Sequence, residues 1–194
     1  PMSLRPGLER IGSTLSDGVS RSVPFIFSVD DTAVIELTNY AMRVRVEDSL
    51  VTRVAHTAAV ANDSFTTDLS SWADNDEVGG VSAWNAGGYM SLIGNGTSAA
   101  IRDQTVSIPI GDYGKELALI IKVIYGELIL RVGNTATGSD ELIAETTLRP
   151  GVHSLAFTPT SANAYIRLQS RINRITLVDY CRLEAAGEMS LGTP

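Results

Sequence analysis

Three aromatic side chains in the middle of the sequence could bind a sugar: Trp84, Tyr89 and Tyr125. An aromatic ring presents a flat apolar face, and such a face suits a pyranose ring. Each of the three could equally pack in a protein core or at its rim. Aromatic residues make up only 6% of the chain, which is a small supply for a strong lectin. Trp84, Tyr89 and Tyr125 are therefore candidate glycan-binding residues, with core packing as the alternative.

Asp179 is the most informative acidic position in the sequence. It has the same parity as Leu177 and Cys181 in a segment whose apolar residues alternate as in a strand. If Asp179 points with these apolar residues, its carboxylate is buried. A buried carboxylate costs free energy unless it is hydrogen-bonded or binds a cation. The sequence leaves both explanations open.

No arrangement of residues marks an active site. One cysteine, Cys181, and two histidines, His56 and His153, exclude an internal disulfide and any multi-cysteine or histidine-rich metal centre. Neither a GxSxG nor an HExxH motif is present. Neighbouring carboxylates such as Asp74 and Asp76 occur in turn-forming segments, whereas a glycosidase requires two carboxylates that face one cleft. The sequence therefore predicts a protein that is not an enzyme and requires no cofactor.

The charge and hydropathy of the chain exclude two classes of partner. With 15 basic and 22 acidic residues the net charge is −7, so the phosphate backbone of a nucleic acid is repelled. The longest apolar runs have the length of a strand, and the sequence shows neither a run of about 20 apolar residues nor a signal-peptide pattern. We therefore expect no nucleic-acid binding and no membrane insertion.

Alternation of apolar and polar residues predicts an all-β protein. In the first 58 residues it runs through 24–29, 33–37 and 42–47, which predicts an antiparallel β-meander. From residue 59 short strands follow at regular spacing with Gly, Asn and Pro turns between them, which predicts an antiparallel β-sandwich of the jelly-roll type. The expected strands are 81–85, 89–93, 99–108, 117–124, 128–132, 142–148, 153–158, 165–170 and 174–183. The segment 139–143 could form a short helical turn.

Residues 4 to 53, about a quarter of the chain, carry a first resemblance to a known family. The sequence LRPGLERIG is followed after a gap by SVPFIFSVDDTAVIELTNYAMRVRVEDSLV. This stretch resembles a segment of tail proteins of short-tailed bacteriophages, the nozzle or tail tubular class. The resemblance implies a β-propeller-like platform in the virion. Copies of this platform would form a ring with other phage tail proteins, around a conduit through which DNA passes without being bound.

Residues 62 to 184, nearly two-thirds of the chain, resemble a second family. The segments NDSFTTDLSSW, SAWN, GYMSLIGNGTSAAIRDQTVSI, RPGVHSLAF and VDYCRLE are similar to carbohydrate-binding-module-like jelly rolls, found in glycoside hydrolases and on phage tail proteins. Such modules share core patterning while their binding faces vary. The resemblance implies that Trp72 is a core residue. It also implies a structural calcium held by Asp179 and by Asn62 or Asp63 with backbone carbonyls; the alternative is that backbone N–H groups cap the carboxylate of Asp179.

The chain begins with proline and stops at LGTP, which we interpret as a fragment of a longer polypeptide. We expect residues 1–58 to be the β-meander segment of a tail platform, residues 59–185 an inserted jelly roll, and residues 186–194 the return into the platform. The expected function is a structural component of a phage tail whose sandwich decorates the tail or contacts host-surface glycan. The alternative is a non-catalytic carbohydrate-binding module of a glycoside hydrolase, which leaves residues 1–58 without a purpose.

Overall fold

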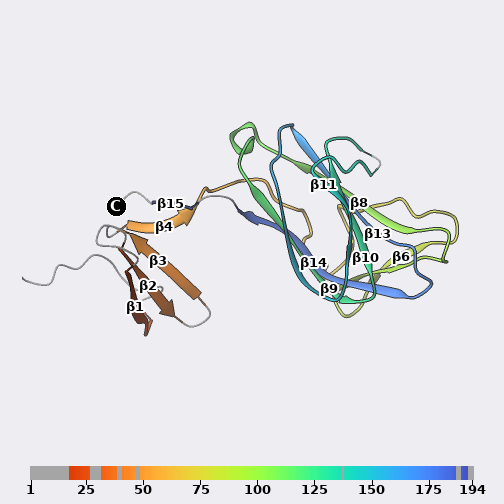
Figure 1. The fold of residues 1–194 in the computed structure, drawn as a ribbon. Coiled ribbons are helices and arrows are strands. Elements are labelled where there is room, and N and C mark those ends of the chain that lie inside the picture. The colour runs from red at the N-terminus through yellow and green to blue at the C-terminus, as the bar shows by residue number, and fades with distance from the viewer. Residues whose placement is uncertain are drawn as a thin grey trace, which may run out of the picture. The chain divides into compact units, whose positions relative to one another are not determined.

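A computed structural model of the 194-residue chain describes residues 18–26, 32–38, 41–46, 49–136, 138–186 and 189–191. The chain divides into two compact units, Pro1–Arg53 with Glu188–Pro194, and Val54–Gly187 (Figure 1). Within the described residues the regular structure consists of strands and one short 3-10 helix, so the predicted all-β class is confirmed. None of the helical structure found in these ranges is long and apolar enough to cross a membrane.

The first unit contains one antiparallel sheet in the order β1-β2-β3-β4-β15. Its strands are β1 (Arg21–Ile26), β2 (Thr32–Thr38), β3 (Ala41–Val46), β4 (Ser49–Arg53) and β15 (Met189–Leu191). β1 to β4 follow one another as a meander. Between β2 and β3, Glu36 lies opposite Arg43 and accepts hydrogen bonds of 2.6 and 2.9 Å from its Nη2. The stretch LRPGLERIG (residues 4–12) and the predicted strand residues 27–29 and 47 lie outside the described residues.

The second unit interrupts the sheet of the first. β4 leads into it at Val54, and the chain returns after it as β15. β15 pairs antiparallel with β4, with Met189 opposite Arg53 and Leu191 opposite Val51. The chain therefore leaves from one strand of the sheet and comes back as its neighbour, which is the connectivity of an inserted domain.

The second unit is a sandwich of two five-stranded antiparallel sheets (Figure 1). One sheet has the order β11-β10-β13-β8-β5 and the other the order β12-β9-β14-β7-β6. The strands are β5 (Ala73–Asp74), β6 (Val81–Asn85), β7 (Tyr89–Ile93), β8 (Ala100–Ser107), β9 (Leu117–Tyr125), β10 (Leu128–Gly133), β11 (Ile143–Leu148), β12 (Gly151–Phe157), β13 (Asn163–Ser170) and β14 (Ile175–Ala185). Each predicted strand is present, with ends that agree within two residues, so the predicted sandwich is confirmed. The two-residue β5 and the 3-10 helix η2 (Ile110–Asp112) were not predicted.

Alternate residues of the strands form the core between the two sheets. The fully buried side chains of β9 and β10 are Leu117, Leu119, Ile121, Val123, Leu128, Leu130 and Val132. Phe65 and Trp72 pack edge to face at the margin of this core, with ring centroids 5.6 Å apart. Trp72 is 3% exposed, so its predicted core position is confirmed.

A β-bulge at Asp179 changes the parity of β14. Val178 pairs with Val123, and the residue after Asp179 pairs with Lys122, so Asp179 is an extra residue on this strand. Val178 is buried before the bulge and Cys181 after it. The prediction that Asp179 points with the apolar residues is therefore wrong. Its carboxylate, 26% exposed, forms an ion pair with Lys122 in which Oδ2 and Nζ are 2.7 Å apart.

The helical turn considered for residues 139–143 is also wrong, because the Leu142 N–H donates to the Val132 carbonyl of β10 at 2.9 Å instead of pairing within a helix. The Ser139 hydroxyl accepts a hydrogen bond from the Thr135 N–H at 3.1 Å and donates one to the Thr135 carbonyl at 2.6 Å. The Glu141 carboxylate accepts a hydrogen bond from the Asn134 N–H at 3.0 Å, which lowers the pKa of Glu141. The segment consequently bends, and β11 begins at Ile143.

A buried carboxylate fastens the beginning of the second unit. Asp112, 2% exposed, accepts hydrogen bonds from the Thr57 N–H at 2.7 Å, the Thr57 hydroxyl at 3.0 Å and the Ala58 N–H at 2.8 Å. Its other oxygen is 3.0 Å from Nζ of Lys115. These contacts hold the pKa of Asp112 well below its usual range. The largest contribution comes from the backbone N–H of Thr57, followed by Lys115 and the remaining donors.

Candidate functional site

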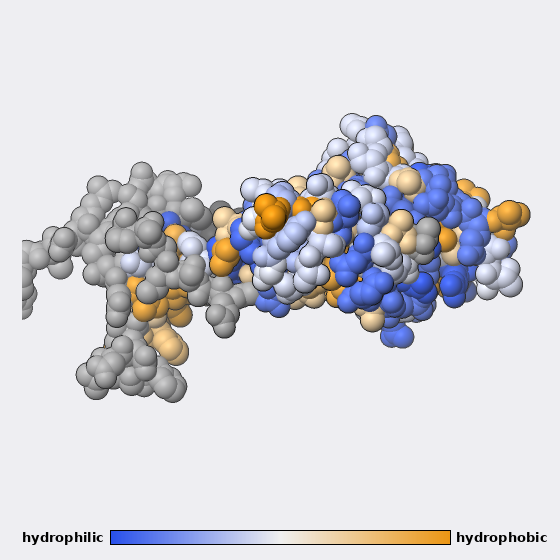
Figure 2. All heavy atoms as spheres, turned by 90° about the horizontal axis from the view of Figure 1, so that it is seen from above, coloured by the Kyte–Doolittle hydropathy of each residue, from blue (hydrophilic) through white to orange (hydrophobic). Residues whose placement is uncertain are grey.

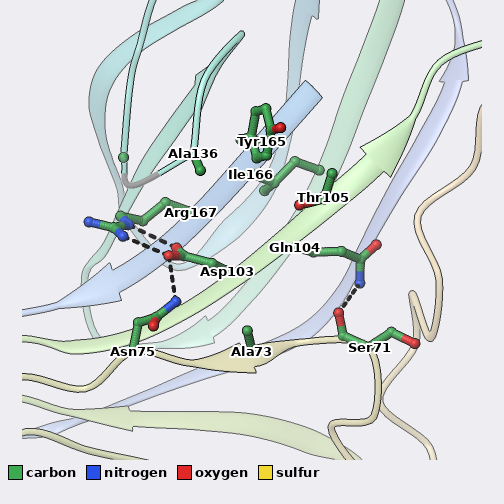
Figure 3. A pocket seen from close by; sticks show the side chains of 11 residues that line it. Ser71, Ala73, Asn75, Asp103, Gln104, Thr105, Ala136, Tyr165, Ile166 and Arg167 are labelled. Atoms are coloured by element: carbon green, nitrogen blue, oxygen red, sulfur yellow. Dashed lines mark hydrogen bonds and ion pairs between the residues drawn. The ribbon is translucent and has the colours of Figure 1, made fainter. Parts of the chain in front are cut away.

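A groove of about 370 Å³ lies on the outer face of the β11-β10-β13-β8-β5 sheet (Figure 3). Asp103 and Thr105 of β8 lie opposite Arg167 and Tyr165 of β13, and they alternate with buried residues such as Gln104. These four side chains therefore stand on the face away from the core. The groove is lined by Ser71, Ala73, Asn75, Asp103, Gln104, Thr105, Ala136, Gly138, Tyr165, Ile166 and Arg167. Its volume lies within the range of small-molecule sites.

A bidentate ion pair crosses the groove between β8 and β13. Arg167 donates from Nε to Asp103 Oδ1 at 2.8 Å and from Nη2 to Asp103 Oδ2 at 2.6 Å. Asn75 donates from Nδ2 to the same Oδ2 at 2.9 Å (Figure 3). The two charged side chains are only 16% and 21% exposed. The hydrogen bonds to Asp103 raise the pKa of Arg167, and the two parallel hydrogen bonds fix the orientation of both side chains.

The loop between β10 and β11 forms one wall of the groove. Gly138 has a φ of +82°, and a Cβ at this position would be 2.6 Å from Nη1 of Arg167. The backbone thus packs directly on the guanidinium, which only glycine permits. Arg131 donates from Nη1 to the carbonyl of Gly138 at 3.2 Å and forms an ion pair with Glu145. These contacts hold the loop against the sheet.

Gln104 fixes the opposite margin of the groove. This buried side chain accepts a hydrogen bond from the Ala61 N–H at 2.8 Å and donates to the carbonyls of Ala61 at 2.9 Å and Ser71 at 3.2 Å (Figure 3). The segment that contains Ser71 and Ala73 is therefore tied to β8 at the edge of the sheet. Both margins are fixed before any ligand arrives, a condition for tight binding.

The groove retains polar atoms with which a ligand could form hydrogen bonds. Among the described residues, the side-chain oxygen of Asn75 and the hydroxyl groups of Thr105 and Tyr165 have no hydrogen-bond partner. Farther along the same face of β13, Nε2 of Gln169 is the one buried side-chain N or O atom of the described residues without a partner. On the face of the second unit that Figure 2 shows, hydrophilic side chains predominate and apolar ones form only small separate patches. The free amide oxygen and hydroxyl groups of the groove could therefore form hydrogen bonds with a polar ligand.

The structure does not bring the predicted aromatic residues together into one surface. Trp84 lies on the edge strand β6 opposite the buried Met90, so its side chain is on the core-facing side of the sheet. It is 39% exposed, and its Nε1–H donates a hydrogen bond to the Phe65 carbonyl at 2.8 Å. Tyr89 precedes Met90 on β7 and faces the other way. Tyr125, 51% exposed, ends β9, which β14 and β7 separate from β6. Glycan binding by these residues stays a prediction.

Asn62, Asp63 and Asp179, the residues predicted to hold calcium, contact other groups of the protein. Asn62 donates from Nδ2 to two backbone carbonyls of the following loop at 3.0 Å each. The backbone carbonyl of Asp63 accepts the N–H of Cys181 at 2.7 Å, whereas the Asp179 carboxylate is paired with Lys122. Within the described residues no three His, Cys, Asp or Glu side chains are grouped so that they could hold a metal ion. Calcium binding here stays a prediction.

The sequence analysis missed Asn75, Asp103 and Arg167. In the sequence, polar residues alternate with mostly apolar, buried ones along β8 and β13. That pattern indicates a solvent-exposed face. It does not indicate which strands are neighbours, and the ion pair joins residues 64 positions apart.

Comparisons with known proteins return structures but no sequence family. No protein-family model matches the chain, and no curated protein matches it. The solved structures similar to it include carbohydrate-binding modules. The ligand-free CBM1 of BiXyn10A is 15% identical with a TM-score of 0.48, covering 69% of this chain and 100% of that one. A mutant of CBM29-2 complexed with mannohexaose is 14% identical with a TM-score of 0.43, covering 66% and 92%. Another CBM29-2 mutant, complexed with cellulohexaose, is 13% identical with a TM-score of 0.41, covering 66% and 92%.

Proposed function

We propose that the Val54–Gly187 unit is a non-catalytic carbohydrate-binding module and that a neutral oligosaccharide binds in the groove over β8 and β13. The observation that supports this most directly is the fixed row of hydrogen-bonding groups formed by Asn75, Asp103 and Arg167, beside the Tyr165 ring (Figure 3). A sugar offers several hydroxyl groups, each of which both donates and accepts. Amide, carboxylate, guanidinium and hydroxyl groups held at fixed angles complement such a ligand.

The electrostatics of the groove favour a neutral ligand. The positive charge of Arg167 is balanced by Asp103 within hydrogen-bonding distance, so the pair presents donors and acceptors without a net charge. An anionic ligand would have to compete with Asp103 for the guanidinium, and a cationic one would have to compete with Arg167. A neutral hydroxyl group can form hydrogen bonds with the pair without displacing either partner.

The groove lacks the residues of a hydrolase. Asp103 is the one carboxylate among the residues that line it, and Asp103 is occupied by Arg167 and Asn75. Cleavage of a glycosidic bond by the usual mechanisms needs two carboxyl groups on opposite sides of the bond. Binding without cleavage is therefore the activity that this geometry supports.

The test measures binding of the full chain to a panel of neutral oligosaccharides that includes mannohexaose and cellulohexaose, by glycan array and then by calorimetry. Thr105→Trp places a large side chain in the groove, and we expect it to weaken binding by at least about tenfold because the ligand is excluded. Thr147→Trp is the matched control, since Thr147 is an exposed threonine on β11 of the same sheet outside the groove. No binding by the folded wild type, or equal loss in both variants, would refute the proposal.

The protein that displays this module is a second, separable part of the proposal. The resemblance of residues 4 to 53 to phage tail nozzle proteins suggests a virion tail, in which the module decorates the tail or contacts host-surface glycan. The insertion between β4 and β15 is compatible with this display, because the five-stranded sheet would remain available for assembly. A module of a glycoside hydrolase is the alternative. Sedimentation of the full chain separates the two: self-association into a ring supports the tail role, and a monomer at all concentrations speaks against it.

A further inference from the structure

A second hollow, of about 660 Å³, lies at one end of the sandwich, where the turns between strands meet. It is lined by Gly96, Tyr125, Gly126, Glu127, Arg149, Pro150, Ile172, Asn173 and Arg174. These residues belong to the β7–β8, β9–β10, β11–β12 and β13–β14 connections, or lie at the strand ends beside them. None of them lines the groove over β8 and β13.

The arginines at this end differ from the other arginines of the second unit. Those at positions 102, 131, 167 and 182 each have a carboxylate within 2.9 Å. Arg149 lies 3.9 Å from Glu127 and its side chain is 83% exposed. Arg171 and Arg174 are exposed and have no hydrogen-bonding or ionic partner of their side chains among the described residues. Two arginines, Arg149 and Arg174, and one acid, Glu127, therefore line this hollow, in a chain whose net charge is −7.

The turns that carry these groups are tied to one another. The Gly96 N–H donates to the carbonyl of Arg171 at 2.8 Å, and the Thr176 hydroxyl donates to the carbonyl of Glu127 at 3.0 Å. Gly126 has a φ of +81°, and a Cβ there would lie 2.6 Å from Oγ1 of Thr176. These contacts fix the positions of the neighbouring turns. The ring of Tyr125, 51% exposed, stands at the rim of a preorganised hollow.

We propose that this hollow is a second ligand site, for a short anionic saccharide. The guanidinium groups of Arg149 and Arg174 bind its carboxylate or phosphate, and the Tyr125 ring contacts the face of the sugar. Guanidinium is the side chain whose planar donors match both anions. A long polyanion such as nucleic acid is disfavoured because the rest of the chain is acidic. The proposal is independent of the groove, which takes a neutral ligand.

Calorimetry on the full chain tests the site with trigalacturonate, its neutral methyl ester and glucose 6-phosphate as probes. We expect the carboxylate or the phosphate probe, or both, to bind more tightly than the ester, and the affinity to fall as salt is raised, because the contact is between exposed charges. Arg174→Ala should weaken that binding by roughly tenfold, the effect of one lost charge-assisted contact. Arg182→Ala removes the same charge from an exposed position on β14 and should leave the affinity unchanged.

The outcomes separate the ligand sources and this site from the groove. Binding of trigalacturonate alone assigns the site to carboxylates, and binding of glucose 6-phosphate alone assigns it to phosphates. The groove variant Thr105→Trp should retain anion binding, whereas loss of anion binding in that variant would place the ligand elsewhere. The proposal would be overturned if trigalacturonate and its methyl ester bind with equal measurable affinity, if Arg174→Ala and Arg182→Ala have equal effects, or if neither anion binds.

Discussion

The ion pair between Arg167 and Asp103 should stabilise the second unit measurably, and a double-mutant cycle measures by how much. The pair has two short hydrogen bonds, of 2.8 and 2.6 Å, and side chains that are 16% and 21% exposed. Exposed ion pairs contribute about 0.2–1 kcal/mol, and removing one partner of a fully buried pair costs about 3–5 kcal/mol. We therefore expect a coupling energy of about 1–2 kcal/mol between Arg167→Met and Asp103→Asn.

The assay is urea unfolding followed by tryptophan fluorescence. The chain's two tryptophans, Trp72 and Trp84, both lie in Val54–Gly187, so the signal reports on the unit that contains the groove. The pair Arg182–Glu184 is the control. Its N–O distance is 2.9 Å, similar to the distances between Arg167 and Asp103, but its side chains are 47% and 49% exposed. A coupling energy at Arg167 and Asp103 no larger than that of the control pair would show that the groove wall is not held by this contact.

Four further outcomes are expected. The lowered pKa of Asp112 stabilises the fold above about pH 4, and the wild type loses this stability as the pH falls toward the folded-state pKa. Asp112→Asn should therefore make the free energy of unfolding less dependent on pH in the acid range, as measured by urea unfolding between about pH 2 and 6. Gly138→Ala should destabilise the unit and weaken glycan binding, whereas Gly114→Ala, also at positive φ but with open space around its Cβ position, should affect stability alone. Trp84→Phe should cost about 1 kcal/mol through the lost N–H contact and leave glycan affinity unchanged, as calorimetry would report. Asp179→Ala should lower the Tm by only a few degrees, since its ion pair is partly exposed. A rise of the wild-type Tm on addition of calcium, lost in Asp179→Ala, would support the predicted metal site.

Alternation within single strands was enough to predict the sandwich, because each strand's buried and exposed faces are local properties of its own sequence. β9 shows this, since its alternate residues from Leu117 to Val123 are buried as the pattern predicts. The same logic failed at Asp179, where one extra residue on β14 reverses the parity and no residue type marks the bulge. The two-residue β5 is too short for any alternation to be recognised.

The candidate groove could not be predicted for a different reason. Its central contact joins Asp103 and Arg167 across two strands, and the sequence does not show that β8 and β13 are neighbours. The wall at Gly138 depends on the path of a loop fixed by its own side-chain hydrogen bonds. Trp84 was predicted to bind glycan because it is aromatic, but its side chain lies on the core-facing side of an edge strand, which the sequence does not show. Sites built from several elements require the tertiary structure.

The most direct measurement is a titration of the isotope-labelled full chain with a neutral oligosaccharide, followed by backbone amide NMR. We expect the largest chemical-shift changes on the outer face of β8 and β13 and at their edge, at Asn75, Asp103, Thr105, Tyr165 and Arg167. Changes confined to the edge strand around Trp84, or to the turns at the end of the sandwich, would contradict the claim that this groove binds the glycan.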